Sequence, residues 1–370
     1  MLAHLASVAT ETRRRARQLS RPLRRVLVWY DALEYAAVPL LREYRLNALV
    51  TPVVWGYRPN VTDEGYFDPA TFQRFGKVFS SALIGTAFKG AAGPTALAVN
   101  LTRYHATHES YMELLRRNPS LNRITHGVVL TGWQRYDHFA ALCELLPAAL
   151  PSLAVNALYL ASDGRTRYEA LLWEARRVLS CPDRGWGGGL ERTKDELMSY
   201  ALTTWREDEL DKGMRRHAER RRLNALRQFA ASGSSPFLDC RFAGHEVLVA
   251  VERLHAYKLQ LASMLTDDHF KGWLSPFQLQ RRYGSHRMSA WFGARLAQAA
   301  RAFAQLETDA RQALGRVLSE DAVEEFVTDQ LLQDGRPLAA MAKAANSTAG
   351  RRTFERRPLD LKVKPSLSQT

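Results

Sequence analysis

The sequence has no apolar run long enough to cross a membrane, which takes about 20 residues, and it has few cysteines. The three cysteines, Cys143, Cys181 and Cys240, lie far apart and lack the spacing of a metal site or a disulfide framework. We therefore expect no membrane span, metal, cofactor or disulfide. Because the N-terminus also lacks the pattern of a secretory signal, we expect an intracellular protein, in the cytoplasm or nucleus.

Acidic residues are also scarce relative to basic ones, 38 against 52, so the net charge is +14. A basic balance is typical of proteins that bind nucleic acid, anionic membranes or acidic ligands. The arginines lie in clusters within residues 13–25, 215–222 and 351–357. None of the clusters is interleaved with aromatic residues that would stack on bases, so solvated helix faces and a loose tail explain them better. We expect no nucleic-acid partner.

What the sequence does contain, over residues 1–165, is an alternation of strand and helix patterns. Four short apolar runs predict strands at Arg25–Tyr30, Leu49–Trp55, Ala82–Phe88 and Gly127–Trp133. They lack clean alternation, as is typical of parallel strands covered on both faces. Helical spacing predicts an N-terminal helix from Leu2 and further helices at residues 32–44, 68–79, 101–117, 138–146 and 152–160.

This order implies right-handed crossovers and a parallel sheet or barrel. A complete eight-stranded barrel takes about 250 residues, so the pattern leaves two alternatives, a small open sheet or half of a barrel. From residue 166 onward only helices are predicted, at residues 167–179, 192–229, 244–265, 289–318 and 321–332. We therefore predict an α/β region at 1–165, a helical region at 166–335 and a disordered basic tail at 336–370.

Aromatic residues end each predicted strand, and ligands of parallel α/β folds bind at the carboxyl ends of the strands. These rings either cap the core or form the walls of a sugar pocket. The last strand is followed by a run of residues that can stack or form hydrogen bonds, from Trp133 to His138, which favours a functional site. From the residue pattern, the ligand-binding candidates are Trp29, Trp55, Phe88, Lys89, Trp133, Arg135, Tyr136 and Asp137.

Several segments resemble the hexosaminidase D-like β-N-acetylhexosaminidases, which are similar to the family 20 glycoside hydrolases. GVVLTGWQRYDHFAALCELLPAALPSL, residues 127–153, looks like the last barrel strand and its loop, and AFKGAAGP, residues 87–94, looks like the preceding strand end. RVLVWYDAL and LVTPVVWGY match the two earlier strands more loosely, and GWLSPFQLQRR and DAVEEFV resemble the helical C-terminal region.

The resemblance implies the C-terminal half of a TIM barrel followed by a helical region. It also implies removal of terminal β-linked N-acetylhexosamine from a glycan or glycoside by a substrate-assisted mechanism, in which the 2-acetamido group attacks the anomeric carbon. Trp29, Trp55 and Trp133 would form the walls of the sugar pocket, and Arg135 and Asp137 would contact hydroxyls. Asp31 is a further polar contact by position.

The catalytic acid of this family lies in a His-x-Gly-x-Asp-Glu motif, which the sequence does not contain. Asp63-Glu64 and Asp195-Glu196 do not follow a strand and a glycine, so no catalytic residue is assigned. We expect a truncated barrel that is inactive by itself. The alternatives are an inactive sugar-binding relative, for which a homodimer is one expected assembly, and a basic protein that binds nucleic acid.

Overall fold

The computed structural model describes residues 1–21, 23–182, 235–266 and 294–348. The chain divides into two compact units, Met1–Val249 and Ala250–Thr370, which we describe one at a time. Within the described residues no helix is long and apolar enough to cross a membrane.

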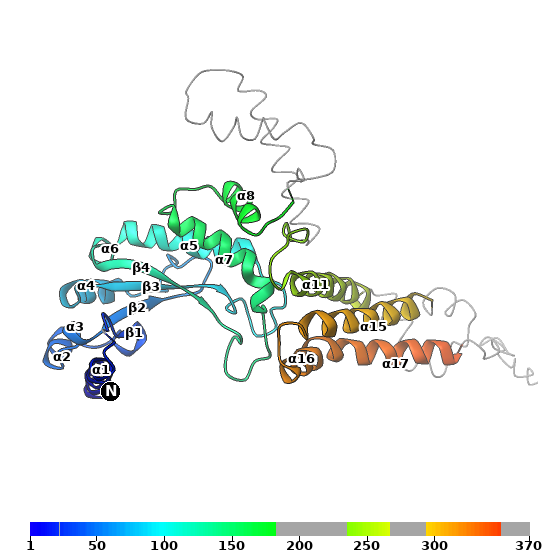
Figure 1. The fold of residues 1–370 in the computed structure, drawn as a ribbon, viewed down its shortest axis with the longest axis horizontal. Coiled ribbons are helices and arrows are strands. Elements are labelled where there is room, and N and C mark those ends of the chain that lie inside the picture. Colours follow the sequence, from blue (N-terminus) through cyan, green and yellow to red (C-terminus); the bar gives the residue numbers. More distant parts are fainter. Residues whose placement is uncertain (22, 183–234, 267–293, 349–370) are drawn as a thin grey trace, which may run out of the picture. The chain divides into compact units, whose positions relative to one another are not determined.

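Four strands form the sheet of the first unit: β1 (Leu27–Trp29), β2 (Thr51–Trp55), β3 (Ala82–Lys89) and β4 (Thr125–Gly132). They lie side by side in sequence order, and every neighbouring pair is parallel (Figure 1). All four predicted strands and the predicted α/β fold class are therefore confirmed. Because the strands are parallel, their carboxyl ends, at Trp29, Trp55, Lys89 and Gly132, lie along one edge of the sheet.

Helices precede, connect and follow the strands of this unit. They are α1 (Leu2–Gln18), η1 (Tyr30–Ala32), α2 (Val38–Glu43), α3 (Leu46–Leu49), α4 (Pro69–Val78), α5 (Leu101–Arg117), α6 (Pro119–Ile124), α7 (Leu146–Ala161) and α8 (Tyr168–Val178). Asp68 and Asn100 cap α4 and α5 by accepting hydrogen bonds from the backbone amides of Ala70 and Arg103, which fixes where these helices begin. The helix predicted at 138–146 is wrong, because α7 begins only at Leu146.

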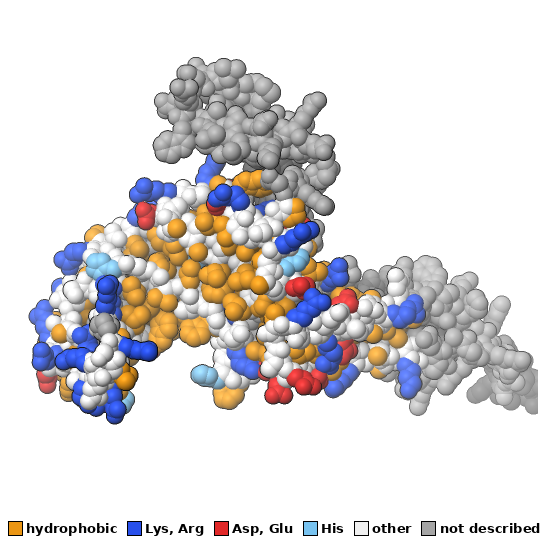
Figure 2. All heavy atoms as spheres, viewed as in Figure 1, with side chains coloured by type: hydrophobic (Ala, Val, Ile, Leu, Met, Phe, Trp, Pro, Cys, Tyr) orange, Lys and Arg blue, Asp and Glu red, His pale blue; other side chains and the backbone are white. Residues whose placement is uncertain are grey.

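The two faces of the sheet are packed differently. Val54 and Ile84 are fully buried in the main core, with Val28 and Val128 packed against it. The opposite face carries Leu27, which is 47% exposed, and the half-buried Leu83 and Val129. Figure 2 shows hydrophobic side chains gathered over the strands. We call the face that carries Val54 and Ile84 the helix face, and the face that carries Leu27, Leu83 and Val129 the inner face.

The second unit contains helix α11 (His245–Thr266), whose first residues belong to the first unit, and α15 (Ala294–Leu314), α16 (Glu320–Phe326), η3 (Val327–Leu332) and α17 (Gln333–Thr348). Tyr257 Oη donates to Ala299 O over 2.6 Å, and Lys258 Nζ lies 3.1 Å from an Asp334 carboxylate oxygen. The tail predicted to be disordered from residue 336 is wrong as far as Thr348, because α17 covers these residues. The helix predicted at 192–229 and the tail from 349 onward lie outside the described residues.

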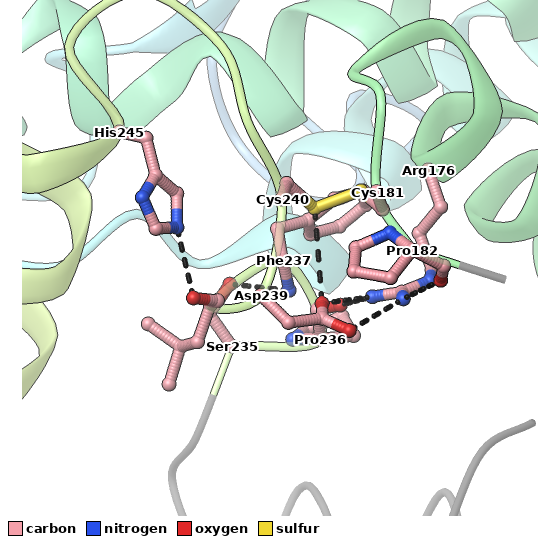
Figure 3. A network of polar contacts seen from close by, with 10 residues as sticks. Arg176, Cys181, Pro182, Ser235, Pro236, Phe237, Asp239, Cys240 and His245 are labelled. Atoms are coloured by element: carbon pink, nitrogen blue, oxygen red, sulfur yellow. Dashed lines mark hydrogen bonds and ion pairs between the residues drawn. A yellow bond between two sulfur atoms is a disulfide. The ribbon is translucent and has the colours of Figure 1, made fainter. Parts of the chain in front are cut away.

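Cys181 and Cys240 form a disulfide, so the expectation of no disulfide is wrong (Figure 3). The two residues are 59 positions apart, and the end of α8 and the loop at 235–240 bring them together. Such proximity arises from tertiary structure and leaves no trace in cysteine spacing. Because disulfides form mainly in oxidising compartments, cysteine usage does not support an intracellular location, which stays a prediction.

Candidate ligand site at the carboxyl ends of the strands

Four rings gather where the parallel strands end, and we call them the aromatic cluster: Trp29, Trp55, Tyr57 and Trp133. The centroids of the Trp29 and Trp133 rings lie 6.1 Å apart, although Trp29 ends β1 and Trp133 follows β4, the two edge strands of the sheet. The ring of Tyr57 lies between those of Trp55 and Trp133, with its centroid 5.2 Å from that of Trp55 and 6.4 Å from that of Trp133. Trp29 and Trp133 are each 39% exposed, so their rings are accessible at the surface of the unit.

Hydrogen bonds with neighbouring polar groups hold Trp55 and Tyr57 of the cluster in place. Trp55 Nε1 donates to Asp31 Oδ1 over 2.8 Å, so the structure brings two predicted site residues together. Burial raises the pKa of Tyr57, and hydrogen bonds with the side chains of Thr131 and Trp133 partly offset this effect. Sequence reasoning missed Tyr57, although it lies two residues after the strand-end Trp55.

The loop after β4 supplies the remaining exposed candidates. Tyr136 is 51% exposed. Arg135 Nη1 donates to Ala140 O over 2.9 Å, and Asp137 Oδ1 accepts from the backbone amide of Phe139 over 2.8 Å. The Arg135 guanidinium and the Asp137 carboxylate therefore help to shape their own loop.

Phe88 and Lys89, the last two residues of β3, are both buried, with Phe88 6% exposed and Lys89 fully enclosed. Lys89 Nζ donates to Gln134 Oε1 over 2.9 Å and to the backbone oxygen of Trp133. Burial lowers the pKa of Lys89 to about 8. These bonds fasten the β4 loop, and with it the Trp133 ring, to the end of β3.

Gly90 is required at the closest approach of these two segments. It adopts a φ of +78°, and a Cβ at this position would lie 1.9 Å from Trp133 O. A side chain would therefore displace the loop that carries Trp133.

Glu144 is fully buried beside this contact. Its Oε2 accepts hydrogen bonds from the Gly90 amide and the Tyr104 hydroxyl, each at 2.5 Å, while Oε1 has no hydrogen-bond partner among the described residues. Burial raises the pKa of Glu144, which the hydrogen bonds and the nearby Lys89 ammonium oppose. The residue also adopts a φ of 41°, which is unfavourable for a side chain with a Cβ. A strained, buried carboxylic acid next to a partly exposed aromatic cluster is typical of a functional site.

Other features of the described residues lie elsewhere. A surface hollow of about 670 Å³ runs along α1, where Glu11, Arg15 and Leu19 line it without an aromatic ring. Glu64 lies exposed in the segment after β2, and Asp195 and Glu196 lie outside the described residues. The strand ends therefore remain the best candidate for the site.

The start of the first arginine cluster makes contacts within the chain. Arg14 and Arg15 pair with Glu11, and Arg13 donates to the backbone oxygens of Ala48 and Leu49. The clusters at 215–222 and 351–357 lie outside the described residues. The absence of a nucleic-acid partner stays a prediction.

The chain is 34% identical over 154 residues to hexosaminidase D of Homo sapiens, a match that covers 41% of this chain and 30% of the relative. It is also 34% identical over 155 residues to hexosaminidase D of Bos taurus, which covers 42% of each protein. The chain is a relative of hexosaminidase D. No protein-family model matches it. It spans less than half the length of these two relatives.

The similarity to hexosaminidase D confirms the family resemblance inferred from the sequence. The parallel α/β sheet agrees with it. The assignment of individual residues to a hexosamine site, the division at residue 165, and a homodimer remain predictions.

Proposed function

We propose that this chain contributes the sugar-binding strand ends of a β-N-acetylhexosaminidase of the hexosaminidase D type. The aromatic cluster is the observation that supports this most directly. A pyranose presents an apolar C–H face, and exposed indole rings at the end of a parallel sheet offer that face a flat surface. Two of the rings, those of Trp29 and Trp133, meet across the sheet and leave part of each ring exposed.

The polar residues around the rings have distinct proposed roles. Asp31 orients the Trp55 indole through the 2.8 Å hydrogen bond between them. Tyr136 and Asp137 extend from the β4 loop as contacts for sugar hydroxyls, with Arg135 shaping that loop. Phe88 and Lys89 are enclosed, so we assign them to positioning Trp133 rather than to direct stacking.

The proposed reaction is the retaining, substrate-assisted hydrolysis of terminal β-linked N-acetylhexosamine. In such a reaction the substrate's acetamido oxygen attacks the anomeric carbon while a carboxylic acid protonates the leaving oxygen. The sequence lacks the Asp-Glu motif that carries the acid in the family it resembles. We therefore assign this chain the binding part of the reaction and no catalytic acid.

The same lack of an Asp-Glu motif favours a second candidate, a sugar-binding relative without catalysis. Both candidates predict that the aromatic cluster binds N-acetylhexosamine. They differ in whether a longer form of the protein supplies the acid and turns the glycoside over.

The test uses fluorogenic β-N-acetylglucosaminide and β-N-acetylgalactosaminide, with binding of the corresponding methyl glycosides followed by saturation-transfer NMR. We compare Trp133→Ala with Trp173→Ala, because Trp173 on α8 is equally exposed, at 40%. We expect saturable binding without turnover. Trp133→Ala should weaken binding at least about tenfold, since a buried aromatic face contributes on the order of 1.5–3 kcal/mol.

Binding that Trp173→Ala weakens as much as Trp133→Ala does would contradict the proposed site. Turnover by this chain would show that another carboxylic acid serves as the proton donor. Glu64, Glu144 and Glu196 would then be replaced by Gln in turn.

A further inference from the structure

Cys181 and Cys240 lie on two segments of the first unit that are distant in sequence. Cys181 comes just after α8, and Cys240 ends a short loop formed by residues 235–240. Cys240 is 1% exposed, and the neighbouring Phe237 is fully buried. The third cysteine, Cys143, is free. Other contacts must bring these two thiols together before a bond can form between them.

Arg176, in the last turn of α8, connects both segments and is only 6% exposed (Figure 3). Its Nη1 and Nη2 donate to Asp239 Oδ1 and Oδ2 over 2.8 and 3.0 Å, which is a bidentate pair. Nη2 also donates to Pro182 O over 3.2 Å, and Nη1 donates to Pro236 O. One guanidinium therefore binds the residue after Cys181 and the residue before Cys240.

The loop has a further anchor that does not involve sulfur. His245 Nε2 donates a hydrogen bond of 2.8 Å to Leu238 O. Like the bonds of Arg176, this contact needs no sulfur–sulfur bond. The reduced chain can thus keep both thiols near each other, and a high effective concentration of one thiol at the other favours closure of the pair by thiol–disulfide exchange.

We propose that Cys181 and Cys240 are a reversible thiol–disulfide site that exchanges with a low-molecular-weight disulfide of the glutathione class, with Arg176 as the residue that aligns the two thiols. One cysteine thiolate attacks the disulfide and releases one glutathione thiolate. The second cysteine thiolate then attacks the mixed disulfide and releases the other. The cysteine pair loses two electrons and two protons, and the glutathione disulfide becomes two glutathione thiols.

A metal site is the competing use of the same residues, since Cys181, Asp239 and Cys240 place one ligand atom each within 4.8 Å of one another. Both carboxylate oxygens of Asp239 are already bonded to the Arg176 guanidinium. A divalent cation would have to displace this interaction and approach a positive charge. The arrangement therefore favours the disulfide.

The test places the full chain in buffers of reduced and oxidised glutathione at several ratios, followed by alkylation of free thiols and mass spectrometry of peptides. We expect a single pair, Cys181–Cys240, that opens again in excess reduced glutathione, while Cys143 stays unpaired. We expect Cys240→Ser to leave Cys181 as a mixed disulfide with glutathione.

The alignment by Arg176 has a matched control on the same helix. Arg177 is exposed and, among the described residues, pairs only with Glu174 in the same turn. We expect Arg176→Gln to lower the effective concentration of the pair by about tenfold or more, as the loss of a preorganised contact does, and Arg177→Gln to leave it unchanged. Asp239→Asn, which keeps one carbonyl acceptor for Arg176, should give an intermediate decrease and serves if Arg176→Gln does not fold.

Three results would overturn the proposal. The first is that both thiols stay free at every ratio of oxidised to reduced glutathione. The second is that Arg176→Gln and Asp239→Asn, folded by circular dichroism, keep the effective concentration of the original chain. The third is that stoichiometric Zn²⁺ binds the reduced pair and protects both thiols from alkylation.

Discussion

The helix face and the inner face of the same four strands differ in how completely they are covered. On β3, Ile84 points to the helix face and is fully buried, whereas its neighbour Leu83 points to the inner face and is half-buried. On β1, Leu27 of the inner face is 47% exposed. Parallel sheets are normally covered on both faces, so β1 and β3 are less completely covered on the inner face, whereas Val53 of that face, on β2, is only 3% exposed.

The aromatic cluster belongs to the inner face. A Cβ at Gly85 would lie 3.0 to 3.2 Å from atoms of Trp55, Val53 and Trp29, so these side chains share the inner face. In a closed barrel this face would be filled by layers of inward-pointing side chains, with the ligand site at the carboxyl end. Under the proposed function, stability and sugar binding would therefore depend on opposite faces of one sheet.

Replacement of neighbouring residues on β3 should show the largest difference. We expect Ile84→Ala to lower the free energy of unfolding by about 2–5 kcal/mol, because it opens a cavity in a closed core, and Leu83→Ala by about 1 kcal/mol. Urea denaturation followed by circular dichroism measures both. Equal losses would mean that the inner face is covered as fully as the helix face.

The next largest effect concerns the contact that positions Trp133. Gly90→Ala would place a Cβ at 1.9 Å from Trp133 O and should cost on the order of 2–4 kcal/mol, together with a loss of sugar binding. Gly65→Ala is the control, because Gly65 has a similar φ of +74° and open space around it. It should cost only about 1–2 kcal/mol for the backbone conformation. If the two variants lose the same stability, the close approach at Gly90 does not constrain the β4 loop.

The sheet was predictable because each strand is a contiguous apolar run, and α5 because its residues have helical spacing. The grouping of Trp29, Trp55 and Trp133 followed from the rule that parallel strands end at one edge. These features depend on short-range patterns and on one topological rule. The sequence therefore indicated the α/β class and the gathering of aromatic rings at the strand ends.

The loop at 138–146 was predicted wrongly because its apolar residues imitate a helix face. Leu142 and Leu145 are buried by tertiary contacts, and the Cys143 amide donates to Gln134 O over 3.0 Å. Glu144 has a φ of 41°, which a right-handed helix does not permit. Long-range bonds decided this conformation, as they did the approach of Cys181 to Cys240, and local spacing carries no record of them.

The smallest predicted effect is a pH dependence that belongs to the helix face. Burial lowers the pKa of His108 to about 4, and its neutral ring donates from Nδ1 to Tyr104 O while Nε2 accepts from the Thr86 hydroxyl. The unfolded chain, with a histidine pKa near 6.5, binds more protons between pH 6.5 and 4, so stability falls as the pH falls through this window. We expect a loss of about 2–3 kcal/mol across it at most.

Thermal unfolding at intervals from pH 7 to pH 4 measures this effect in the original chain and in two variants. His108→Gln should reduce the slope of stability against pH, because it removes the titrating group from the buried face. His126→Gln replaces an exposed histidine on β4 and should leave the slope unchanged. A slope that persists in His108→Gln would assign the acid sensitivity to other groups. The pH dependence of stability would then not be a property of the helix face.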